Sequence, residues 1–189
     1  MLLITFQYIP IQLNVAFLAI KEEEVSLWFY PLAFFTHVYS SIFSLVFGFF
    51  QFFNWIRLKY KVTHKYLGSI YIFVVLFLSG PSGLFMSIFA NGGLISRISF
   101  TLLSILWMYF TFMGYRSVKN KDISSHEKWM IRSYSLTLSA LSLRLFKWLI
   151  ACSLNLPPMD IYRIVSILGW TFNLLIAEII IYQFYKKKY

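Results

Sequence analysis

The sequence predicts an all-α protein, a polytopic transmembrane helix bundle of about six helices in a single integral-membrane domain. Of its 189 residues, 59% are apolar and only 13% are charged, whereas a soluble domain is about half apolar and about a quarter charged. The apolar residues form runs of about 20, the length that a helix needs to cross the hydrocarbon core. Most Lys and Arg residues fall in alternate segments between these runs, which is typical of loops that share one side of a membrane.

Five of the predicted helices are strongly apolar and one is weaker. The strong helices are expected at about 32–53, 66–89, 97–115, 130–152 and 162–185. The weaker one, at about 2–20, contains Gln7, Pro10, Gln12 and Asn14. Because it lacks the basic start and the clear small-residue cleavage site of a secretory signal, it is interpreted as a first transmembrane helix.

The helix expected at 66–89 contains the sequence Ser-Gly-Pro-Ser-Gly at residues 79–83. Pro81 has no backbone donor and clashes with the preceding turn, and Gly80 and Gly83 loosen the helix further. A broken helix is therefore expected at 79–83.

The distribution of positive charge predicts the orientation. Twelve Lys and Arg residues lie in one alternating set of segments and three in the other, while Arg144 and Lys147 lie within a helix. Since cytoplasmic loops collect Lys and Arg, the richer side and both termini are expected in the cytoplasm of a bacterial inner membrane. Topology and attraction to anionic lipid then explain the net charge of +10, and no nucleic-acid partner is expected.

A first polar site is expected in the outer leaflet. A rise of about 1.5 Å per residue places His37, Arg144 and the break at 79–83 at similar depths in three helices. Charged groups at this depth are costly, and broken helices in membranes often line binding sites. The alternative is that Pro81 only kinks its helix, that Arg144 reaches outward to the interface, and that His37 hydrogen-bonds a neighbour.

A second polar cluster is expected at the cytoplasmic ends of the helices, around His64 and His126. The two imidazoles come just before two different helices and are candidate ligands for a metal ion or a haem iron. Gly68, one turn after His64, would permit close approach of a helix or a flat ligand. Interfacial histidines also cap helices and bind lipid phosphates, which is the alternative. The side chains expected around the pair are Gln51, Met130, Arg132 and Glu178.

Several motifs together resemble a bacterial family of predicted membrane proteins, named for its domain of unknown function 2306. The resemblance covers about residues 36–146 and includes Gly-Phe-Phe-Gln-Phe at 48–52, His-Lys-Tyr-Leu-Gly at 64–68 and His-Glu-Lys-Trp-Met-Ile-Arg-Ser at 126–133. It also includes His37, Gly92, Gly93 and Arg144. Phe49 and Glu127 stand where the family usually has proline and a basic residue. The resemblance implies a membrane protein and supplies no activity.

Three functions are compatible with these observations. The first is binding of haem b or a metal ion through His64, His126, His37 and Arg144, with a role in membrane electron transfer beside a redox partner; a looser similarity to membrane b-type cytochromes supports it. The second is a ligand-binding, lipid-binding or transport bundle built around Arg144 and the broken helix. The third is an assembly or scaffold subunit of a membrane complex. No catalytic motif occurs, so enzymatic activity is left open.

Overall fold

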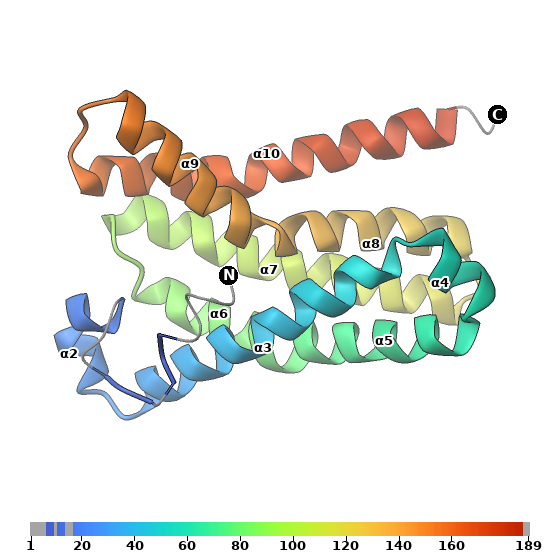
Figure 1. The fold of residues 1–189 in the computed structure, drawn as a ribbon, viewed down its shortest axis with the longest axis horizontal. Helices are drawn as coiled ribbons and strands as arrows, with labels where there is room; N and C mark the ends of the chain where they lie inside the picture. Colours follow the sequence, from blue (N-terminus) through green and yellow to red (C-terminus); the bar gives the residue numbers. More distant parts are fainter. Residues whose placement is uncertain (1–6, 10, 14–16, 187–189) are drawn as a thin grey trace.

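The computed structural model describes residues 7–9, 11–13 and 17–186, with only the backbone for residues 184–186. The described residues form a helical bundle (Figure 1). Its long elements are α3 (Phe29–Gln51), α5 (Lys61–Phe73), η2 (Val74–Ser79), α6 (Gly80–Ile88), α7 (Gly93–Lys119), α8 (Ile123–Thr137), α9 (Ser139–Ser153) and α10 (Pro158–Lys186). The short helices are η1 (Leu18–Ile20), α2 (Glu22–Val25) and α4 (Asn54–Lys59).

The described helices provide four membrane crossings, or five if the bent pair α8–α9 is one span. The four, α3, the continuous α5–η2–α6 segment, α7 and α10, are each long and apolar enough to span a bilayer. The pair α8–α9 is bent by 41°. Many Leu, Ile, Phe and Val side chains on these helices are exposed, which suits a protein whose solvent is lipid. The prediction of an all-α transmembrane bundle is therefore confirmed.

The prediction of a helix over 2–20 was wrong for the residues that the structure describes. Residues 7–9 and 11–13 form turns, bends and irregular backbone, and residues 18–20 form a single 3₁₀ turn. Tyr8 and Leu18 pack instead against Phe34 and Phe35 of α3. Gln7, Gln12 and the other polar groups of this stretch make it a poor spanning helix in hydrocarbon. The remainder of the predicted range lies outside the described residues.

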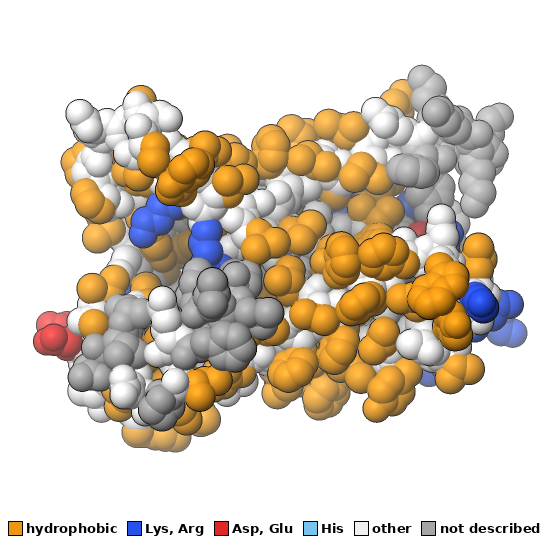
Figure 2. Space-filling view, in the orientation of Figure 1, with side chains coloured by type: hydrophobic (Ala, Val, Ile, Leu, Met, Phe, Trp, Pro, Cys, Tyr) orange, Lys and Arg blue, Asp and Glu red, His pale blue; other side chains and the backbone are white. Residues whose placement is uncertain are grey.

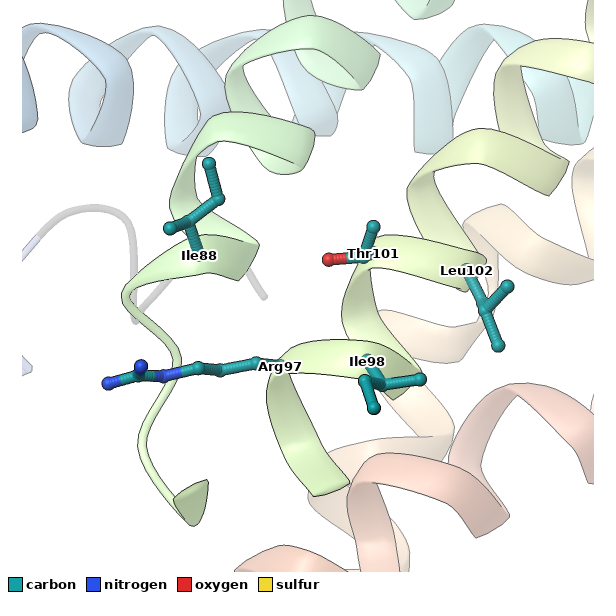
Figure 3. A pocket seen from close by; sticks show the side chains of 5 residues that line it. All are labelled: Ile88, Arg97, Ile98, Thr101 and Leu102. Atoms are coloured by element: carbon teal, nitrogen blue, oxygen red, sulfur yellow. The ribbon is translucent and has the colours of Figure 1, made fainter. Parts of the chain in front are cut away.

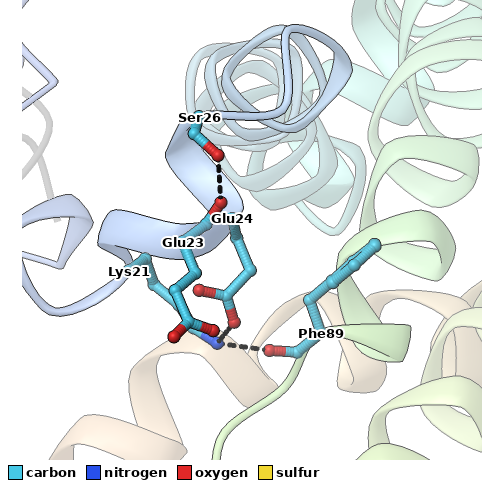
Figure 4. A network of polar contacts seen from close by, with 5 residues as sticks. All are labelled: Lys21, Glu23, Glu24, Ser26 and Phe89. Atoms are coloured by element: carbon cyan, nitrogen blue, oxygen red, sulfur yellow. Dashed lines mark hydrogen bonds and ion pairs between the residues drawn. The ribbon is translucent and has the colours of Figure 1, made fainter.

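The two ends of the bundle differ in charge. We call the end that carries α4, the α7–α8 connection and the end of α10 the basic end, and the opposite end, with α2 and Asp160, the acidic end (Figure 1). At the acidic end Lys21 is only 3% exposed, and its Nζ donates hydrogen bonds to Glu24 Oε1 and to the carbonyl oxygen of Phe89, both at 2.6 Å (Figure 4). Lys21 thus ties the N-terminal segment to the end of α6.

The helix around Ser79–Gly83 is distorted at the predicted level but not divided in two. Val74–Ser79 form a π-helical segment, and Gly80 N donates to the carbonyl oxygen of Val75, five residues earlier. A Cβ atom at position 80 would collide with that carbonyl, so the wide turn requires glycine there. The π-helical segment accommodates Pro81, because proline lacks the donor that a regular turn would need. The axis continues through α6 to Ile88.

A sharper bend occurs at Leu138, where the sequence predicted one uninterrupted helix over 130–152. Two hydroxyl groups in the last turns of α8 bond back to backbone carbonyls, Ser135 to Arg132 at 2.7 Å and Thr137 to Ser133 at 3.3 Å. Just past the bend, the hydroxyl group of Ser142 donates instead to Asn173 Oδ1 of α10 at 2.8 Å. Back-bonding hydroxyls of the first kind bend helices. After the bend the backbone of α9 runs close to α10 and to the end of α8, and among the described residues it does not come close to the backbone of α3, α6 or α7.

The core lies where α5, η2, α7 and α8 meet. Its fully enclosed members include Tyr71 and Val75, packed with Trp107, Phe110 and Tyr134. Gly48 lets α3 approach this core, because a Cβ atom there would lie 2.5 Å from the Tyr134 ring and 2.9 Å from the Tyr71 ring.

Replacing Gly48 with alanine is expected to destabilise the bundle by about 1–3 kcal/mol, because the added methyl group meets two buried rings that have no free space to move into. Gly68→Ala is the matched control, since its Cβ atom would meet only the end of the Gln51 side chain at 3.0 Å. The midpoint of thermal unfolding in detergent measures both. An equal or smaller loss in Gly48→Ala than in Gly68→Ala would contradict this account of the α3 packing.

Candidate functional site

A polar cluster lies between α3 and the distorted helix. His37 Nδ1 is 2.8 Å from the carbonyl oxygen of Ser79, and the hydroxyl groups of Ser40 and Ser79 are 2.7 Å apart. A Cβ atom at Gly83 would lie 2.8 Å from His37 Cε1, so this glycine makes room for the imidazole. The structure therefore brings together His37 and the Ser79–Gly83 stretch, as their depths predicted.

The hydrogen bond of His37 determines its tautomer. A carbonyl oxygen can only accept, so Nδ1 carries the proton and Nε2 of the neutral ring carries a lone pair. His37 is partly exposed at the surface of the bundle. It is thus an oriented acceptor within a membrane-spanning segment.

An apolar groove of about 290 Å³ adjoins this cluster. Its α3 wall is formed by Phe29, Leu32, Ala33 and Thr36, and its other wall by Phe77, Leu78, Pro81, Ser82 and Phe85. Residues three and four apart share a helix face, so the α3 wall continues one turn deeper as His37 and Ser40. The polar cluster therefore lies beside the groove, on the same face of α3 as the residues that line it.

The contacts that the structure describes for Arg144 do not involve His37 or the Ser79–Gly83 stretch. Its Nη1 donates to the carbonyl oxygen of Ala140 on its own helix at 2.7 Å, and its charge interacts with Tyr8 of the N-terminal segment. The bend at Leu138 is the reason, because it directs α9 along α10 and away from α3. Lys and Arg side chains are visible on this face between α9 and the lower helices (Figure 2).

At the basic end, Gln51 links α3 to α5. With its amide oriented to satisfy its neighbours, the Gln51 nitrogen donates to His64 Nδ1 at 2.9 Å and to the His64 carbonyl oxygen at 3.1 Å. Its oxygen accepts from the Gly68 nitrogen at 3.2 Å. Gly68 therefore makes room for Gln51 in this structure. Because His64 Nδ1 accepts, the proton of the neutral imidazole lies on Nε2.

His126 has the opposite tautomer. Its Nδ1 donates to the carbonyl oxygen of Gly114 at 2.8 Å, which leaves a lone pair on Nε2. Met130 packs one turn later against the same Gly114. His64 lies close enough to His126 and Arg57 for their charges to interact, so the two histidines do share the basic end.

Arg132 and Glu178 form an ion pair that joins α8 to α10. Nε and Nη2 of Arg132 donate to the two carboxylate oxygens of Glu178 at 2.5 Å and 2.8 Å. The guanidinium lies 4.8 Å from the centre of the Trp129 ring. Arg132 and Glu178 were expected to line a ligand site. In the structure their opposite charges form an ion pair with each other.

A buried hydroxyl network at the centre of the bundle escaped the sequence analysis. Tyr71 OH lies 2.7 Å from Ser133 Oγ and 2.9 Å from Thr137 Oγ1. Thr111 Oγ1 lies 2.6 Å from Ser133 Oγ, and Trp107 Nε1 donates to Thr137 Oγ1 at 3.0 Å. The available signal was the spacing of four between Ser133 and Thr137 and between Trp107 and Thr111, which places each pair on one helix face.

Two carboxylates in the connections are stabilised in their charged form. The backbone N–H of Ser125 donates to Asp122 at 3.0 Å, which caps α8 and lowers the pKa of Asp122. Burial raises the pKa of Glu24, but the hydrogen bond and charge of Lys21 and the charge of Arg97 outweigh it, so its pKa lies below the usual value. Within the part of the chain that the structure describes, no three His, Cys, Asp or Glu side chains gather as a metal-binding group.

The fold and its polar interior define the class of this molecule: it is a multi-pass helical membrane protein. Residues 34–181 match the family described as "Predicted membrane protein (DUF2306)", and the chain belongs to that family. The resemblance noted in the sequence is thereby confirmed. No curated protein and no solved structure matches the chain.

Proposed function

We propose that this protein binds an apolar molecule that dissolves in the bilayer and carries a hydroxyl group, such as a quinol. The hydrophobic part lies in the groove between α3 and α6, and the hydroxyl group donates to His37 Nε2. One observation carries the proposal: a partly exposed histidine with an oriented acceptor nitrogen lies one turn beyond Ala33, which lines a lipid-level apolar groove.

Three further features support this assignment. Ionisable residues within membrane spans are generally functional, because keeping them there is costly. Short π-helical segments occur frequently at functional sites, and Val74–Ser79 provides the carbonyl that orients His37. The groove is widely open at the surface of the spanning helices, so a molecule dissolved in the bilayer can enter it from the side.

Equilibrium binding of decylubiquinol to the protein in nanodiscs tests this function. His37→Phe is expected to weaken binding by roughly tenfold, the loss of about one hydrogen bond. Leu32→Trp fills the groove without touching His37 and should weaken binding as well, whereas Val46→Trp, an exposed position farther along α3, should not. Wild-type affinity in both His37→Phe and Leu32→Trp would refute the proposal.

Binding of haem b at the basic end is a second candidate, favoured by the tautomer of His126. A donated Nδ1–H and a free Nε2 lone pair are the arrangement of a histidine that ligates iron. His64 becomes a second ligand only if the Gln51 amide turns over, so that Nδ1 of His64 donates to it and Nε2 gives up its proton. Bound haem would supply one-electron transfer.

The absorption spectrum of protein purified from haem-replete cells tests the second candidate. A Soret band is expected, and it should disappear in His126→Ala but remain in His37→Ala, since His37 lies near the acidic end. A colourless wild-type protein rules out this candidate and leaves the groove proposal unaffected.

We propose further that the basic end faces the cytoplasm, because cytoplasmic loops collect Lys and Arg. The expectation that both termini are cytoplasmic depended on a helix over 2–20. Described residues 17–28 lie at the acidic end, so the proposal keeps a cytoplasmic location only for the C-terminal end of α10.

Cysteine labelling in intact cells measures this orientation. In a Cys152→Ser background, a membrane-impermeant maleimide should label Ser26→Cys and Asn155→Cys from outside. Lys61→Cys and Lys119→Cys should react only after lysis. All four positions are exposed, so accessibility of the side chain does not bias the comparison. Labelling of Lys61→Cys in intact cells would reverse the assignment.

A further inference from the structure

A second groove, of about 330 Å³, lies on the other side of α6, where α6 ends and α7 begins. Its walls are mainly apolar and are formed by Ile88, Ile98 and Leu102, with Thr101 and Arg97 completing it (Figure 3). The Thr101 hydroxyl group is already bonded to Ser87 at 2.8 Å. Arg97 is therefore the polar group of this groove that remains to be explained.

Arg97 has no hydrogen bond or ion pair with any residue that the structure describes, and its side chain is exposed. Its guanidinium extends across the connection between α6 and α7 (Figure 3). It lies in the first turn of α7, about 6 Å from the start of the helix at Gly93. Leu102 lies about 7.5 Å deeper along the same helix. The groove thus runs from a cation near the membrane surface toward the hydrocarbon core.

The surrounding charges restrict the kind of occupant. The charge of Arg97 interacts with Glu24, which also binds Lys21, and Glu22 and Glu23 belong to the same short helix. An occupant with a net negative charge would meet three carboxylates at this end. An occupant with a phosphate and a nearby ammonium group would find an opposite charge for each, Arg97 for the phosphate and the α2 carboxylates for the ammonium group.

We propose that this groove holds a zwitterionic phospholipid of the surrounding bilayer. The phosphate binds the Arg97 guanidinium, whose planar fork of donors fits phosphate oxygens. One acyl chain lies along Ile98 and Leu102, and the ammonium group of the head faces the acidic helix α2. This site is separate from the α3–α6 groove and does not depend on the function proposed for it.

Native mass spectrometry of protein released from nanodiscs tests the site. The nanodiscs contain equal parts of phosphatidylethanolamine and phosphatidylglycerol. The wild type should retain one phosphatidylethanolamine, and Arg97→Gln should reduce that adduct by roughly tenfold, the loss of a charge-assisted hydrogen bond.

Filling the groove provides an independent variant with a matched control. Leu102 and Ile105 lie on the same helix and are 46% and 47% exposed, but only Leu102 lines the groove. Leu102→Trp should lose the adduct and Ile105→Trp should keep it, and neither should unfold the protein. Wild-type retention in Arg97→Gln and Leu102→Trp would overturn the proposal. Retention of phosphatidylglycerol in place of phosphatidylethanolamine would also overturn it.

Discussion

The absence of water from the hydrocarbon core of the bilayer is the constraint on which the rest of the structure depends. In hydrocarbon every buried donor and acceptor needs a protein partner. Tyr71 shows how this is met, since its hydroxyl group reaches Ser133 and Thr137 of α8, and these reach Thr111 and Trp107 of α7. Because apolar packing between helices gains little over packing against lipid, such shared hydroxyl groups and close approaches at small residues select the neighbours. The network thus sets which helices surround the core.

The same constraint explains where the helices become irregular. Pro81 and Gly80 produce a π-helical segment in which two carbonyl oxygens have identified donors. The Val75 oxygen accepts from the backbone N–H of Gly80, and the Ser79 oxygen accepts from Nδ1 of His37. Pro81 itself is exposed and forms part of a groove wall. The distortion therefore creates two features together: an oriented histidine and a recess at the lipid-facing surface.

Much of the fold could be predicted from the sequence because hydropathy and length are properties of single segments. Residues 32–53, 66–89, 97–115 and 162–185 correspond to helices that begin and end within about five residues of the expectation. The largest differences are the start of α5, five residues earlier, the start of α10, four residues earlier, and α7, four residues longer at each end. The prediction of a helix over 2–20 was wrong at the residues that the structure describes there, because its apolar content hides polar groups such as Gln7 and Gln12 that a spanning helix cannot satisfy. The bend at Leu138 escaped because it arises from hydroxyl side chains that also occur in straight helices.

The candidate site was predictable only in part, for a related reason. Depth along a helix follows from residue counting, and it correctly joined His37 to the Ser79–Gly83 stretch. Which side of a helix faces which neighbour does not follow from counting. Arg144 was assigned to the same site by depth alone. In the structure it belongs to α9, which the bend at Leu138 directs along α10. Similarly, Arg132 and Glu178 were recognised as polar residues near a site, but their bidentate pairing depends on the contact between α8 and α10.

The acidic end shows how one buried cation connects the N-terminal segment to the binding surfaces. Lys21 donates to the carbonyl oxygen of Phe89, the residue that ends α6, and this contact holds the connection between α6 and α7. Both grooves use α6, one through Pro81 and Ser82 and the other through Ile88. A buried ammonium group is costly unless its hydrogen bonds are satisfied, and Glu24 supplies the counter-charge. The described part of the N-terminal segment therefore contributes by fixing the end of the spanning segment Lys61–Ile88.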